Sequence, residues 1–135
     1  MSSTIQTASV QAALGRCLRS PYLAVDESRR GQVQSELDAA RQLYEQALAS
    51  FTEDDEATGL KQIWGAVYRS ARALAYKAGY RVDQLECLET VLRVHYSAIG
   101  DEEIAEMRRA QELVGTRDVA IARARTFMEK VASLV

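Results

Sequence analysis

Apolar residues recur every three or four positions through two long stretches of the chain, and this spacing constrains the fold most strongly. The first stretch contains Val33, Leu37, Ala40, Tyr44, Ala47 and Phe51, and the second contains Leu60, Trp64, Val67, Ala71, Leu74 and Ala78. Steps of four and three residues place all members of such a series on one face of an α-helix. The pattern therefore predicts two amphipathic helices, each burying one face.

Glycines and capping residues divide the rest of the chain into further helices. Thr52 is expected to cap the helix that Gly79 ends, because glycine adopts the left-handed conformation of a helix C-terminus readily. Asp83 and Glu86 are spaced as a capping box for a helix that is expected to stop at Gly100. The helices expected are about 4–19, 33–51, 53–78, 84–99, 101–114 and 117–135. No segment shows the alternating pattern of a strand.

Helices joined by short links predict an all-α fold. We expect an up-and-down bundle of four main helices plus one or two shorter helices, because short links make neighbouring helices antiparallel. The 135 residues fit one domain. Within it, residues 1–25 are expected to form an N-terminal helix and connector, and residues 26–135 the bundle.

Charge and cysteine content bear on the compartment and the partners. The net charge of −2 gives no general attraction to nucleic acid or acidic membranes. No signal peptide and no membrane span is expected, and a cytoplasmic location is predicted. Cys17 and Cys87 lack partners at metal-ligand spacing, so two reduced, packed thiols are predicted, with a disulfide as the alternative.

The segment YRSARALAYKAGYRVDQLECLETVL, residues 68–92, resembles the central helical hairpin of the HEPN family (higher eukaryotes and prokaryotes nucleotide-binding domain). The residues that carry the resemblance are Tyr68, Ala71, Ala73, Leu74, Gly79, Glu86, Cys87 and Leu88. It implies a bundle of four or five helices that is usually dimeric. Many members of the family are metal-independent ribonucleases, in which an arginine precedes a histidine by four to six residues.

The chain departs from the family at this ribonuclease motif. His95 is the only histidine, and positions 88–90, where the arginine should stand, hold Leu, Glu and Thr. The arginine-rich stretch 108–125 contains no histidine. Glu102, Glu103 and Glu106 lack the Glu-x-x-His pairs of iron-binding bundles, so a solvated helical face is expected there. We therefore predict a non-catalytic protein without a cofactor or metal site.

The function that these observations favour is association with another protein. The interface candidates are aromatic residues, which often anchor interfaces: Tyr44, Trp64, Tyr68 and Tyr76. The partner is expected to be a second copy of the chain or another protein, and the resemblance implies a defence or toxin–antitoxin system. The alternative is an RNA-binding protein or ribonuclease whose arginines contact phosphates. The arginines expected to contact either phosphate or an acidic partner are Arg69, Arg72, Arg81, Arg108, Arg109 and Arg117.

Overall fold

Helices make up nearly all of the fold, and the predicted all-α class is confirmed. The structure is a computed structural model that describes the backbone of residues 2–135 and the side chains from residue 8 onward. Its elements are α1 (Ser2–Leu18), β1 (Leu23–Val25), the 3-10 helix η1 (Glu27–Gln32), α2 (Val33–Thr52), α3 (Glu56–Lys77), β2 (Tyr80–Val82), α4 (Leu85–His95), α5 (Asp101–Gln111) and α6 (Arg117–Leu134). None of the helices described is long and apolar enough to cross a membrane.

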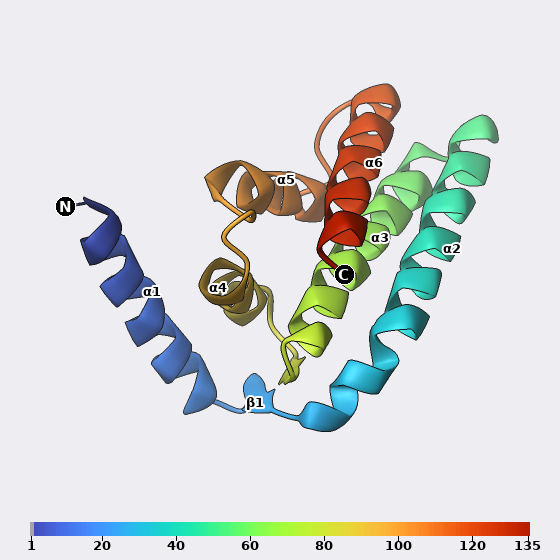
Figure 1. The fold of residues 1–135 in the computed structure, drawn as a ribbon. Coiled ribbons are helices and arrows are strands. Elements are labelled where there is room, and N and C mark those ends of the chain that lie inside the picture. The colour runs from blue at the N-terminus through green and yellow to red at the C-terminus, as the bar shows by residue number, and fades with distance from the viewer. Residues whose placement is uncertain (1) are drawn as a thin grey trace.

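The helix α3 lies at the centre of the molecule. It packs against α2, α4, α5 and α6, with α2 beside it along most of its length (Figure 1). The helices α4 and α5 are short and cross the long helices at an angle, whereas α1 diverges from the bundle. The contacts of α1 are chiefly with α4 and β1. The bundle therefore surrounds α3, and α1 is attached to its side.

Glycines allow α2 and α3 to approach closely. Gly59 faces the buried ring of Phe51, and a Cβ atom at Gly59 would lie 2.4 Å from Phe51 Cε1. Gly65 faces Leu43 in the same way, with a Cβ-to-Cδ1 distance of 3.0 Å. Side chains at these two positions would push the helices apart, since protein interiors are close-packed.

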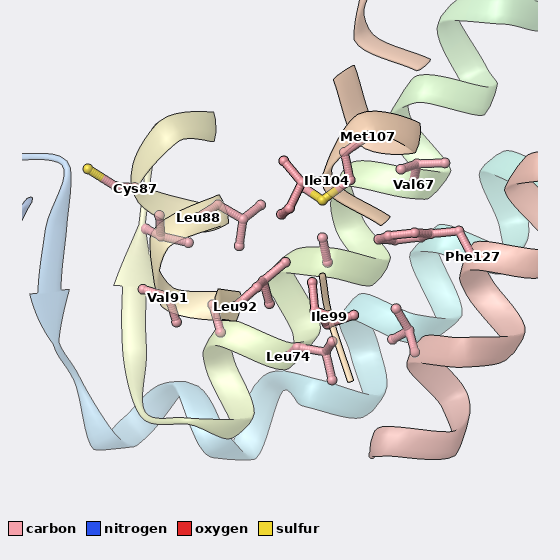
Figure 2. Close-up of a cluster of buried hydrophobic side chains, with 14 of the residues drawn as sticks. Val67, Leu74, Cys87, Leu88, Val91, Leu92, Ile99, Ile104, Met107 and Phe127 are labelled. Carbon is pink, nitrogen blue, oxygen red and sulfur yellow. The ribbon is translucent and has the colours of Figure 1, made fainter. Parts of the chain in front are cut away.

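The core forms where the short helices meet α3. Leu88 and Leu92 of α4 point toward Leu74 of α3, and Ile104 and Met107 of α5 close the cluster from the other side (Figure 2). All five side chains are buried. This core fixes the positions of α4 and α5 on α3, while α2 and α6 pack against α3 as well.

A two-stranded sheet joins the N-terminal segment to the bundle, contrary to the prediction that no strand would form. The strands β1 and β2 are antiparallel, with Leu23 opposite Val82 and Val25 opposite Tyr80. Each strand has three residues, which is too short for an alternating pattern to show in the sequence. The expectation of strand-free connectors was therefore wrong.

The ends of α3 show one predicted boundary and one correction. Gly79 follows the helix with a φ of +88°, as predicted for a C-terminal glycine. The predicted cap Thr52 instead ends α2, where its hydroxyl bonds to the carbonyl of Leu48. Asp55 caps α3, because its carboxylate accepts a hydrogen bond from the Thr58 amide. The acidic run does supply the cap, but three residues later than expected.

The helix α4 is shorter than predicted at both ends. Its N-cap is Gln84, without a capping side-chain bond, so the capping box of Asp83 and Glu86 was wrong. The helix stops at His95 rather than at Gly100. Gly100 instead precedes α5, and its amide donates to the Glu103 carboxylate at 3.0 Å.

The two cysteines form a disulfide, which corrects the prediction of free thiols. The Cys17–Cys87 bond joins the end of α1 to α4, and the two Cα atoms are 5.7 Å apart. The residues are 70 positions apart in the sequence, so their spacing carried no sign of this proximity. They meet because the short sheet brings α1 back alongside α4.

Candidate functional site

Aromatic and arginine side chains follow one side of α3 at intervals of four residues. We call the series Trp64, Tyr68, Arg72 and Tyr76 the aromatic stripe. The ring centroids of Trp64 and Tyr68 are 5.4 Å apart. The Arg72 guanidinium lies 5.3 Å from the centroid of Tyr68 and 5.6 Å from that of Tyr76, within the range of cation–π attraction. The four side chains therefore form a continuous ladder.

A buried carboxylate on α2 fixes the arginine of this stripe. Glu36 is only 8% exposed and accepts hydrogen bonds from Nε and Nη2 of Arg72, each at 3.0 Å. Arg69 adds a longer bond of 3.4 Å. Burial of Arg72 disfavours its charge, but the hydrogen bond and charge of Glu36 outweigh burial and raise the Arg72 pKa. Bidentate pairing of this kind is rigid and strong, so Arg72 is held in one place.

The aromatic members of the stripe differ in exposure. Tyr76 is 4% exposed and offers little surface to a partner. Tyr68 is half-buried at the edge of the core, and burial raises its phenol pKa although Arg72 acts in the opposite direction. Trp64 is partly exposed and lies outside the core cluster. Trp64 and Tyr68 are therefore the accessible part of the stripe.

Tyr44, the fourth aromatic candidate, lies away from the stripe. It lines a hollow of about 220 Å³ between α2 and α6, next to Leu37 and Met128. Its hydroxyl accepts a hydrogen bond from Arg125 Nε at 3.2 Å. The structure thus brings three of the four predicted interface residues together on α3 and places Tyr44 at a separate site.

Each of the six arginines predicted to contact phosphate lies beside a carboxylate. The pairs are Arg69 and Arg72 with Glu36, Arg81 with Asp83, Arg108 with Glu89, Arg109 with Glu106, and Arg117 with Asp54 and Glu56. The arginines are spread over α3, β2, α5 and α6. Neighbouring carboxylates cancel much of the field that would attract a phosphate backbone. The six residues therefore do not act as one basic surface.

His95 ends α4, and its exposed side chain is paired with a tyrosine. The Tyr80 hydroxyl and His95 Nε2 are 2.9 Å apart and share a hydrogen bond. Burial raises the pKa of the Tyr80 phenol. The nearby Arg93 is bonded to Asp101 at 2.7 Å. His95 is therefore held by Tyr80, and the nearby Arg93 is engaged by a carboxylate.

Of the three glutamates of α5 expected on a solvated face, Glu102 is exposed, whereas Glu103 and Glu106 are paired, which corrects the expectation for these two. Glu103 is bonded to Lys130 of α6, and Glu106 to Arg109 at 2.7 Å. Glu106 also lies 3.6 Å from Nε of Arg123. Among the residues described, no group of His, Cys, Asp and Glu side chains has the arrangement of a metal site. These carboxylates therefore connect α5 to α6.

Glu36, which holds Arg72 of the stripe in place, was not predicted from the sequence. A signal was present, because Glu36 falls on the apolar face of its helix between Val33 and Ala40. A carboxylate at such a position is buried and needs a charged partner. Arg69 and Arg72, three residues apart on the next helix, are the partners that it finds.

The comparisons with known proteins do not identify the site. No protein-family model, no curated protein and no solved structure matches the chain. The resemblance of residues 68–92 to HEPN proteins therefore stays an expectation from the sequence. What the site can do follows from its two partly exposed rings, its fixed arginine and its paired charges.

Proposed function

We propose that the protein is a non-catalytic helical protein, similar to HEPN domains, that acts by protein–protein association through Trp64 and Tyr68. The observation that supports this most is the position of Trp64, a large aromatic side chain of α3 that lies outside the core cluster and is partly exposed. Tryptophan, tyrosine and arginine are the residues most enriched among interface hot spots. The stripe presents all three in a fixed arrangement.

The partner we propose first is a second copy of the same chain. In a two-fold dimer the same surface patch meets itself, and the rings of Trp64 and Tyr68 can stack on their own copies in offset or tilted geometry. Glu36 fixes Arg72 before the partner arrives, so little side-chain entropy is lost on binding. Association with a different protein through the same rings is the second form of this proposal.

The absence of a ribonuclease motif supports a non-catalytic role. His95 is engaged by Tyr80, and the chain has no arginine at the positions that the HEPN motif requires. We also propose a cytoplasmic location, from the absence of a recognisable signal peptide in the sequence. The proposal of a role in a defence or toxin–antitoxin system comes from the resemblance.

The mass of the protein in solution tests the proposal. Light scattering during gel filtration over the micromolar range should give a dimer for the wild type. Trp64→Ala should weaken the dimer about 30-fold or more, as expected for a hot-spot residue. Tyr22→Ala is the control, because Tyr22 is an exposed aromatic residue away from the stripe. A wild type that stays monomeric at every concentration overturns self-association.

RNA binding is the alternative function, and one observation favours it. The partly exposed rings of Trp64 and Tyr68 lie next to Arg69 and Arg72, an arrangement that suits base stacking. The carboxylate pairing of the arginines weighs against it. Binding of single-stranded RNA across a salt series separates the two functions, because phosphate-driven affinity falls steeply with salt. Cleavage of RNA by the wild type and not by His95→Ala would show that the protein is an enzyme.

A further inference from the structure

A disulfide joins α1 to the rest of the molecule, in addition to the packing of Leu14. Of residues 8–18, only Leu14 is buried. The contacts of α1 are mostly with α4, and the Cys17–Cys87 bond lies between these two helices. In Figure 2 the Cys87 sulfur points away from Leu88 and the rest of the buried cluster. The bond therefore fastens α1 to α4 at the edge of the core, where Leu14 and Cys17 also pack.

A hollow at the surface gives access to this bond. It has a volume of about 240 Å³ and is lined by both cysteines together with Arg16, Ser20, Tyr22, Gln84 and Glu86. Cys17 is partly exposed, whereas Cys87 is 3% exposed. A small thiol that enters the hollow therefore meets the Cys17 sulfur first.

The Cys87 sulfur lies near the N-terminus of a helix. Cys87 is the third residue of α4, within the first turn of the helix. The positive end of a helix favours negative charge on the departing sulfur, whereas the burial of Cys87 opposes it. Attack at Cys17 with release of Cys87 is thus favoured chiefly by access.

We propose that Cys17–Cys87 is a thiol-exchange site for a low-molecular-weight thiol such as glutathione, and that opening it releases α1 from α4. A thiolate attacks Cys17 Sγ, a mixed disulfide forms on Cys17, and the electron pair of the broken bond leaves with Cys87 as a thiolate. A second thiol then attacks the mixed disulfide. The protein gains two thiols with their protons, and two molecules of the small thiol are oxidised to one disulfide.

The consequence of the exchange is confined to α1. The sheet still ties residues 23–25 to β2, and Leu88, Val91 and Leu92 still face the core. Loss of α1 uncovers the side of α4 that carried it, a surface distinct from the aromatic stripe on α3. Disulfides in a reducing cytoplasm are usually transient or redox-sensing, and such a role agrees with the compartment proposed above.

The test is a redox titration of the full chain with reduced and oxidised glutathione. Alkylation and mass spectrometry count the free thiols, and hydrogen exchange follows the amides of residues 8–18. We expect both thiols to appear together, with exchange in residues 8–18 faster by about tenfold or more, because a local restraint is lost. The amides of α2, α3 and α6 should keep their protection.

The double variant Cys17→Ser/Cys87→Ser is the control. Its residues 8–18 should exchange as fast as those of the reduced wild type and should not respond to glutathione. Two results would overturn the proposal. One is a bond that glutathione opens only under conditions that unfold the bundle. The other is a reduced wild type in which residues 8–18 stay as protected as before. Both readouts use the wild type, so they do not depend on folding of the variant.

Discussion

The helices α3 and α1 are comparable in length but are held in the molecule by different means. The 22 residues of α3 include ten that are buried, among them Ile63, Val67 and Leu74. The 17-residue helix α1 buries Leu14 alone within residues 8–18, and Leu18 at its end is 40% exposed. Extensive apolar burial stabilises α3, whereas a covalent bond, a short sheet and the burial of Leu14 keep α1 in place.

This contrast shows that a helix can have a defined position in the fold and still contribute little to its stability. Segments with few buried contacts open locally at a lower free energy than the core. The bundle around α3 should therefore unfold as one cooperative unit, and α1 should open before it once the disulfide is gone. A helix held in this way is suited to conditional release, and a helix at the centre of the core is not.

The largest expected difference between the two regions comes from equal truncations. Leu74→Ala creates a cavity at a fully buried position of α3 and should lower the free energy of unfolding by about 3 kcal/mol. Leu14→Ala should cost less than about 1 kcal/mol, because its effect is limited to the small free energy with which α1 docks. Urea denaturation of both variants with the disulfide intact measures the two values. Equal losses would contradict the comparison.

Glycine substitutions should act with opposite signs in the two helices. Gly59→Ala places a Cβ atom against the buried Phe51 ring and should destabilise the bundle by about 1–3 kcal/mol. Gly15→Ala meets only the flexible end of Arg19, at 3.4 Å, and alanine favours a helix over glycine by about 0.5–1 kcal/mol. Thermal unfolding and hydrogen exchange of residues 8–18 measure the two effects. If Gly59→Ala is neutral, the packing of α2 on α3 is looser than described.

The same contrast explains which parts of the fold the sequence could predict. The spacing of apolar residues is local information, and it predicted α2 and α3 to within a few residues. The strand pairing of Leu23 with Val82 and the Cys17–Cys87 bond join distant residues that no local pattern relates. These are the contacts that place α1, so the position of α1 was the least predictable feature.

The candidate site was predictable in part for the same reason. Trp64, Tyr68 and Tyr76 were predicted from residue type as interface candidates, and their spacings of four and eight residues place them on one side of a helix. Which of these rings is exposed depends on neighbouring elements, and Tyr76 is buried. The pairing of the arginines depends on carboxylates from other segments, of which Glu36 and Glu89 are buried. The sequence alone could not show that each of these arginines lies beside a carboxylate.

An intermediate effect is expected where α2 and α3 are joined by charge. Glu36→Gln keeps the shape of the side chain but removes the charge that Arg72 and Arg69 bond to, and its new amide faces donors. The loss should be about 1–2 kcal/mol, since the arginines are partly exposed and can be rehydrated. Asp38→Asn is the matched control, an exposed carboxylate on the same helix, with an effect within about 0.5 kcal/mol. Urea denaturation should show a larger loss of unfolding free energy for Glu36→Gln than for Asp38→Asn. Similar losses for the two variants would mean that the charge pair does not add to the stability provided by apolar burial.

The smallest effect is expected where α5 meets α6, and it should depend on pH. The hydrogen bond from Lys130 lowers the Glu103 pKa against the opposing effect of burial, and the Gly100 amide helps. A carboxyl whose pKa is lower in the folded state stabilises the fold fully above the ordinary glutamate pKa, about 4.3. That contribution is lost as the pH falls through the lowered folded value. Glu103→Gln should therefore cost no more than about 1 kcal/mol at pH 7, because surface pairs are screened.

Stability measurements at acid pH then distinguish the Glu103–Lys130 charge pair from an effect of packing. The stability difference between wild type and Glu103→Gln should shrink and disappear as the pH falls below the lowered Glu103 pKa, because both chains are then uncharged at this position. Glu102→Gln, an exposed neighbour on α5, should show little difference at any pH. Urea denaturation from neutral to acid pH provides the measurement. A difference that persists in acid would mean that Glu103 holds α5 by packing, as α3 is held, rather than by charge.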